Sequence, residues 1–85
     1  MKPGDFVKIK YSSKLLQLGL CELVNRFGQV TKIVRDKHDR IAGAFIIPNT
    51  GRLKNDEWYI PVQSIESVET LNRIRNKGIL KQTVL

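Results

Sequence analysis

Five short segments of the chain are alternately or continuously apolar, at lengths typical of β-strands. In the first of them, Val7 and Ile9 lie on one face, while Lys8 and Lys10 share the other face with Phe6. Gly, Pro, Asn or Asp lies near the ends of each segment, as is usual where strands meet turns. The pattern predicts strands over residues 6–10, 29–35, 41–48, 57–61 and 65–69.

The segment between the first two strands, residues 12–27, has a different periodicity. Its apolar residues include one stripe at helical spacing, formed by Leu16, Leu20, Leu23 and Phe27. Ser13 is a suitable N-cap, and Gly28 is expected to end the helix. Gly19 interrupts the stripe and equally fits the residue that follows a first short helix. The sequence therefore predicts either one helix with a weak point or two short turns.

Glycine, proline and polar residues mark the connections between the strands. Residues 36–40 predict a charged hairpin turn, and residues 49–56 predict a polar loop. Gly43 lies inside the third strand, where it suits a bulge or sharp bend. Pro61 has no N–H to donate and therefore ends the fourth strand, after which residues 62–64 fit a single helical turn.

Together these elements predict a mainly β fold. We expect a small five-stranded antiparallel barrel with a short helical excursion between strands 1 and 2 and a C-terminal extension. Apolar side chains between Val7 and Val68 meet inside this closed sheet, and the charged side chains stay outside. Strict alternation along the second strand puts Val30, Lys32 and Val34 on the same side of the sheet.

Length and charge divide the chain into one domain and a tail. Eighty-five residues suffice for a single core, and the formal net charge is +7. Residues 1–69 carry eleven Lys or Arg and eight Asp or Glu, a balance of +3, whereas residues 70–85 carry four cations and no acid. The sequence therefore predicts a small barrel domain over 1–69 and a basic, partly apolar tail over 70–85. The excess charge favours acidic partners, although it also serves solubility.

The reactive residue types argue against catalysis and metal binding. Cys21 is the only cysteine and His38 the only histidine, and they lie in different predicted elements, so no nucleophile–base pair is indicated. Asp36, His38 and Asp39 lie close together, but structural zinc usually needs several Cys or His, and a solvated hairpin tip explains them better. The chain also lacks a Gly-rich phosphate loop. We therefore expect no enzyme activity, no cofactor and no metal.

We expect neither an export signal nor a membrane span in this sequence. It begins Met-Lys-Pro-Gly without an apolar stretch behind these residues. No run approaches the roughly 18 apolar residues of a transmembrane helix. With its single cysteine, the chain is expected to be cytoplasmic, with no membrane partner and no small-molecule substrate.

Residues 4–69 resemble the small Src-homology-3-like barrels of bacteria, including translation-type KOW modules. The resemblance rests on Gly-Asp-x-Val-x-Ile at residues 4–9, a long excursion, Gly-x-Val at 28–30, Trp-Tyr-Ile-Pro at 58–61, and Ile-Glu-Ser-Val at 65–68. It implies a five-stranded barrel with a one-turn helix before the last strand. It implies no activity, since such barrels bind RNA, DNA, peptides and other subunits alike. The Leu-rich excursion, with Glu22 as its only acid, argues against binding of Pro-rich motifs.

An aromatic side chain among cations favours binding to nucleic acid. Trp58 and Ile60 share one face of the fourth strand, which we expect to be the core, so Tyr59 lies outside. An exposed ring can stack on a base while nearby cations hold phosphates, and the alternative is that it only covers the barrel wall. The candidate nucleic-acid-binding residues are Lys8, Lys10, Lys32, Arg52, Lys54, Tyr59, Arg73, Arg75 and Lys77.

A protein–protein interaction is the alternative function. The tail contains apolar residues, and an exposed Leu15 or Leu18 would add to an apolar patch rimmed by basic residues. A regulatory adaptor domain of a larger bacterial assembly fits the same features. The sequence therefore predicts a non-enzymatic binding module, with RNA or DNA as its first candidate partner and protein as its second.

Overall fold

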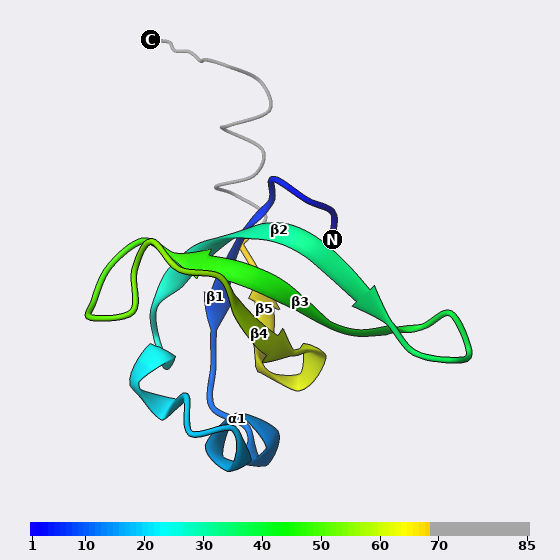
Figure 1. Cartoon of the computed structure of the whole chain (residues 1–85), viewed down its shortest axis with the longest axis horizontal. Coiled ribbons are helices and arrows are strands. Elements are labelled where there is room, and N and C mark those ends of the chain that lie inside the picture. Colours follow the sequence, from blue (N-terminus) through cyan, green and yellow to red (C-terminus); the bar gives the residue numbers. More distant parts are fainter. Residues whose placement is uncertain (69–85) are drawn as a thin grey trace, which may run out of the picture.

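The computed structural model describes residues 1–68, and its elements are shown in Figure 1. Along these residues they are β1 (Phe6–Ile9), α1 (Ser13–Gln17), the 3-10 helix η1 (Cys21–Leu23), β2 (Phe27–Arg35), β3 (Ile41–Pro48), β4 (Trp58–Pro61), the 3-10 helix η2 (Val62–Ser64) and β5 (Ile65–Ser67). Each predicted strand is present, and the helical turn predicted before the last strand is confirmed as η2. The predicted end of the fifth strand, Glu69, and the predicted tail lie outside the described residues.

The strands form one antiparallel sheet in the order β4-β3-β2-β1-β5. The mainly β fold is therefore confirmed. The two edges of the sheet are β4 and β5, and within residues 1–68 they are not paired with each other, so the pairing does not close the sheet into a ring. Figure 1 shows the β2–β3 hairpin at one end of the molecule and the loop between β3 and β4 at the other.

One face of the sheet carries the hydrophobic core. Its buried strand residues are Val7, Ile9, Val30, Ala44, Ile46 and Ile60. Leu15 from α1 and Leu23 from η1 complete this core. Trp58 packs against the core while half-buried, and its indole N–H donates to the Leu53 carbonyl at 3.0 Å. The expected core face of β4, with Ile60 more buried than Trp58, is confirmed.

The excursion between β1 and β2 consists of two short turns rather than one helix. After α1, Gly19 adopts a left-handed φ of +72°, as expected for the residue that follows a first short helix. The prediction that Ser13 is the N-cap is wrong. Ser12 holds that position, and its Oγ accepts a hydrogen bond from the Leu15 N–H at 3.1 Å.

The predicted helical stripe is also wrong. Leu16 is 56% exposed, whereas the preceding Leu15 is fully buried. Because the chain turns at Gly19, the four residues of the stripe never belong to one helix. The expectation that Leu15 adds to an exposed patch is wrong because Leu15 is part of the core, while Leu18 is exposed as expected.

Two glycines permit close approach of neighbouring strands. The prediction that Gly28 ends a helix is wrong, because Gly28 lies buried within β2. A Cβ at this position would stand 2.5 Å from Ile46 Cγ2 and 2.8 Å from the Ile47 carbonyl oxygen. At Gly43 a Cβ would stand 2.5 Å from the Ile60 carbonyl oxygen. The pairing of β2 with β3 is irregular next to Gly43, which agrees with the predicted bulge.

A second irregularity in β2 decides which side chains face outward. Val30 pairs with Ile46, but the next pair is Lys32 with Phe45, so Thr31 is an extra residue. Strict alternation would leave Val30 and Lys32 on the same side. The extra residue instead turns Lys32 away from the core, where it is exposed, and brings Ile33 against the core. The prediction that Val30 and Lys32 lie on the same side of the sheet is therefore wrong.

Candidate nucleic-acid interface

The face of the sheet opposite the core carries a basic residue beside two aromatic rings. Lys32 in β2 pairs with Phe45 in β3, which in turn pairs with Tyr59 in β4. The rings of Phe45 and Tyr59 meet edge to face, with centroids 5.8 Å apart and an interplanar angle of 68°. Both rings are half-buried, whereas Lys32 is exposed. We call these three residues the outer row.

A second basic residue lies further along the same face. Lys8 in β1 pairs with Phe27 in β2 on one side and with Glu66 in β5 on the other. The carboxylate on the neighbouring strand offsets part of the lysine charge. Lys32 has the aromatic Phe45 as its strand partner instead. Of these two lysines, Lys32 is therefore the stronger candidate for a phosphate contact.

The Tyr59 side chain is held across β3. Its hydroxyl donates to the Ala42 carbonyl at 3.3 Å, and a Cβ at Gly43 would stand 2.7 Å from the ring carbon Cζ. The ring thus covers the backbone of Gly43 on the side away from the core. The expected outward direction of Tyr59 is confirmed, and the ring covers part of the sheet as the alternative reading proposed.

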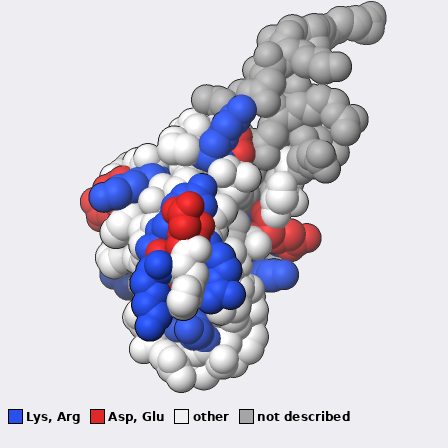
Figure 2. Space-filling view, turned by 90° about the vertical axis from the view of Figure 1, so that its right-hand side faces the viewer, with Lys and Arg blue, Asp and Glu red and all other residues white. Residues whose placement is uncertain are grey.

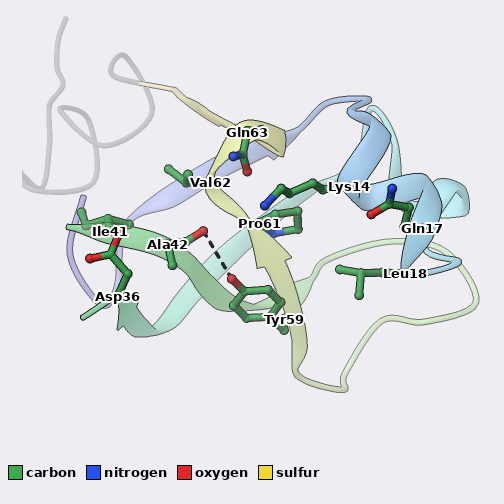
Figure 3. A pocket seen from close by; sticks show the side chains of 10 residues that line it. All are labelled: Lys14, Gln17, Leu18, Asp36, Ile41, Ala42, Tyr59, Pro61, Val62 and Gln63. Carbon is green, nitrogen blue, oxygen red and sulfur yellow. Dashed lines mark hydrogen bonds between the residues drawn. The ribbon is translucent and has the colours of Figure 1, made fainter. Parts of the chain in front are cut away.

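A groove lies beside Tyr59, between α1, the start of β3, β4 and η2 (Figure 3). It has a volume of about 440 Å³. Its lining residues are Lys14, Gln17, Leu18, Asp36, Ile41, Ala42, Tyr59, Pro61, Val62 and Gln63. The wall formed by α1 is fixed to η2, because the Oγ atoms of Ser12 and Ser64 are 2.5 Å apart and hydrogen-bonded. The Lys10 N–H also donates to the Ser64 carbonyl at 2.8 Å.

The charges of the β2–β3 hairpin are largely compensated within the turn. Asp36 accepts hydrogen bonds from the backbone N–H groups of His38 at 2.8 Å and Arg40 at 3.0 Å, and its second oxygen lies 3.5 Å from Arg40 Nε. Arg35 lies 3.8 Å from Asp39. Figure 2, which views this end of the molecule, shows cationic side chains around a smaller acidic group. Among residues 1–68, no group of three or more His, Cys, Asp or Glu is arranged to hold a metal ion.

The two cations predicted in the β3–β4 loop lie at the opposite end of the sheet from the hairpin (Figure 1). Arg52 is bound to Glu22 of η1, with Nη2 and Oε1 2.7 Å apart. The hydrogen bond from this carboxylate, together with its charge, raises the pKa of the Arg52 guanidinium above its ordinary value. Lys54 is exposed in the same loop. Neither residue belongs to the outer row.

The structure thus brings only some of the predicted site residues close together. Lys32 and Tyr59 share the outer row, Lys8 lies on the same face, and Lys10 is exposed immediately after β1. Arg73, Arg75 and Lys77 lie outside the described residues.

Sequence reasoning missed four residues of this region. Phe45 was not among the predicted site residues, although alternation with the buried Ala44 and Ile46 places its side chain outward. Lys14, Gln17 and Gln63 come from α1 and η2, and no sequence spacing brings them to Tyr59. The pairing of Ser12 with Ser64 that brings these elements together carries no motif.

The helices of the described part are short, with five residues in α1 and three in each 3-10 helix. None of them is long and apolar enough to cross a membrane. No family model matches the chain, and comparison with curated proteins and with solved structures gives no significant match.

Proposed function

We propose that this chain is a non-enzymatic binding module that holds RNA or DNA, mainly through the phosphate backbone. The outer row carries this proposal. A lysine beside two aromatic rings offers a positive charge to a phosphate and an apolar surface to a base. The net charge of +7 supports an anionic partner, because neutralised phosphates release their counterions.

A Src-homology-3-like barrel is the scaffold that we propose for this module. Three features support it: the strand order β4-β3-β2-β1-β5, the excursion before β2, and the single helical turn before β5. Such a scaffold is rigid, so it presents the outer row in a fixed geometry.

The absence of ion pairs at most of the described candidate cations also supports the proposal. Within residues 1–68, Lys8, Lys10, Lys32 and Lys54 form no ion pair, whereas Arg52 is occupied by Glu22. Unpaired lysines bind phosphate without first breaking an internal contact. We therefore expect the lysines of the outer face to contribute more affinity than Arg52.

The test is a fluorescence-polarisation titration of the full chain with labelled oligonucleotides over a range of salt concentrations. If Lys8, Lys10 and Lys32 each neutralise one phosphate, the logarithm of the affinity falls with the logarithm of salt with a slope of about −2 to −3. Absence of binding at low salt, or a slope near zero, would overturn the proposal.

A pair of charge-matched variants locates the surface. Lys32→Gln is expected to reduce the magnitude of the salt slope by about 0.7–0.9, the loss of one phosphate contact. Lys54→Gln removes the same charge from the loop at the other end of the sheet and is expected to change the slope less. An equal change in both variants would show diffuse attraction and would remove the outer row from the proposal.

Exposed apolar side chains favour a second candidate function, the docking of a protein. Tyr11, Leu16 and Leu18 are 59%, 56% and 49% exposed, and all three lie in or beside α1. If this patch mediates self-association, sedimentation of the full chain will depend on concentration, and the double variant Leu16→Ser, Leu18→Ser will remain monomeric. A wild-type chain that stays monomeric at every concentration would refute self-association through this patch.

A further inference from the structure

We propose that the groove beside Tyr59 is a subsite for one nucleotide of a single-stranded nucleic acid. The base stacks on the Tyr59 ring, and the adjoining phosphate binds Lys14. This inference rests on the proposed function and deepens it, because it names the form of the nucleic acid and the place where one base is held.

The Tyr59 ring is oriented before any ligand arrives. Its hydroxyl is bound to the Ala42 carbonyl at 3.3 Å, its ring lies over Gly43, and its contact with Phe45 fixes the angle between the two rings. Figure 3 shows this hydrogen bond turning the hydroxyl end of the side chain toward β3. A preoriented ring loses little conformational entropy when a base stacks on it.

The size and the polar groups of the groove suit a nucleotide. Its volume of about 440 Å³ lies within the roughly 300–1,000 Å³ of typical small-ligand sites. Gln17 from α1 and Gln63 from η2 contribute side-chain amides, which both donate and accept hydrogen bonds. Pro61 and Val62 supply apolar contact surface. This combination fits the edge and the face of a planar, polar ring.

The groove is lined by one cation and one acid, whose formal charges cancel, but the acid is already paired with a neighbouring arginine. Asp36 is its acidic residue, but that carboxylate already accepts two backbone hydrogen bonds and lies 3.5 Å from Arg40 Nε. Lys14 is the lysine of the groove, and within residues 1–68 it forms no ion pair. The uncompensated ammonium group therefore favours an anionic ligand such as a phosphate.

The stacking surface selects single strands over duplexes. In a duplex both faces of each base are covered by neighbouring bases, so the Tyr59 ring would first have to displace one of them. An unpaired base already has an accessible face, and stacking on an aromatic side chain tolerates any base. We therefore expect binding of a single strand to depend on Tyr59, and binding of a duplex to be independent of it.

The experiment compares four variants of the full chain, using a short oligothymidylate as the single strand and a duplex of equal length. Tyr59→Leu is expected to weaken binding of the single strand by roughly 5- to 150-fold, the loss of one base stack. Tyr59→Phe loses the hydroxyl but keeps the ring and its contacts with Gly43 and Phe45, and it is expected to retain most of the affinity. Lys14→Gln is expected to weaken binding more than Lys37→Gln, a control that removes the same charge from the hairpin tip. Two-dimensional NMR with thymidine monophosphate should shift the amide signals of the groove first.

The outcomes separate this inference from the proposed function. If the oligothymidylate binds with a steep salt dependence but Tyr59→Leu and Tyr59→Phe bind equally, the subsite is refuted and backbone binding stands. If neither oligonucleotide binds at low salt, both proposals fail. If Tyr59→Leu does not fold, the subsite is tested by comparing the affinities of Lys14→Gln and Lys37→Gln. Equal affinities of these two variants would refute the subsite.

Discussion

The two faces of the sheet are built from the same strands but differ in how completely their side chains are buried. On the core face, Ala44, Ile46 and Ile60 are fully buried. On the outer face, Phe45 and Tyr59 alternate with these residues and remain half-buried, beside the exposed Lys32. The core face is constrained by packing. The outer face keeps aromatic surface that the described residues do not fully cover, and this is the surface that we assign to a ligand.

Neighbouring substitutions in β3 should separate the two roles most strongly. Ile46→Ala removes a fully buried side chain and is expected to lower the free energy of unfolding by roughly 2–5 kcal/mol. Phe45→Ala is expected to cost less stability, because its ring is only half-buried, but to weaken oligonucleotide binding. Urea denaturation and fluorescence polarisation measure the two effects. Equal losses of stability would contradict the distinction between the faces.

A methyl group at Gly43 should disturb both faces at once. The new Cβ in Gly43→Ala would stand 2.5 Å from the Ile60 carbonyl oxygen and 2.7 Å from Tyr59 Cζ. Relief of this overlap requires movement of β4, and we expect a loss of about 1–3 kcal/mol in the free energy of unfolding. The NMR signals of the Tyr59 ring should shift as well. Unchanged stability together with unchanged ring signals would show that β3 and β4 do not approach this closely.

The hydrogen bond between α1 and η2 should have a smaller effect on stability, concentrated at the groove. Ser64 is fully buried, and Ser64→Ala leaves Ser12 without this partner. We expect a loss of roughly 1–2 kcal/mol, within the range for an unmade buried hydrogen bond. Ser12→Ala also removes the N-cap of α1, which alone contributes about 1 kcal/mol. A thermodynamic cycle of the single and double variants should be non-additive, and strict additivity would mean that the two hydroxyls are not coupled.

The predictability of the fold differs between the two faces for a physical reason. Alternation of apolar residues revealed the strands because burial of Val7, Ile9 and Ile60 requires it. Alternation alone could not place Val30 and Lys32 on opposite sides of the sheet, because Thr31 has the chemistry of an ordinary strand residue and nothing marks it as extra. A single inserted residue changes the face of every residue after it.

The groove was less predictable still. Tyr59 was identified from its own strand, but Lys14 and Gln63 reach it only through contacts between elements distant in the sequence. The position of α1 depends on Ser12 as N-cap rather than the neighbouring Ser13, and two adjacent serines look equivalent in a sequence. Local patterns therefore located individual side chains but not the cavity that they form.

The smallest effect concerns the loop at the far end of the sheet, where Glu22 neutralises Arg52. Their side chains are 42% and 76% exposed, so solvent screens the ion pair and neither Glu22→Gln nor Arg52→Gln should measurably change the melting temperature. Because the carboxylate raises an already high pKa, Arg52 stays charged throughout the neutral range, and charge variants are needed to show its contribution. Glu22→Gln releases the guanidinium and is expected to steepen the salt dependence of oligonucleotide binding by at most about 0.7–0.9 in slope, whereas Arg52→Gln should leave it nearly unchanged. A large loss of affinity in Arg52→Gln would show that this loop, rather than the outer row, contacts the nucleic acid.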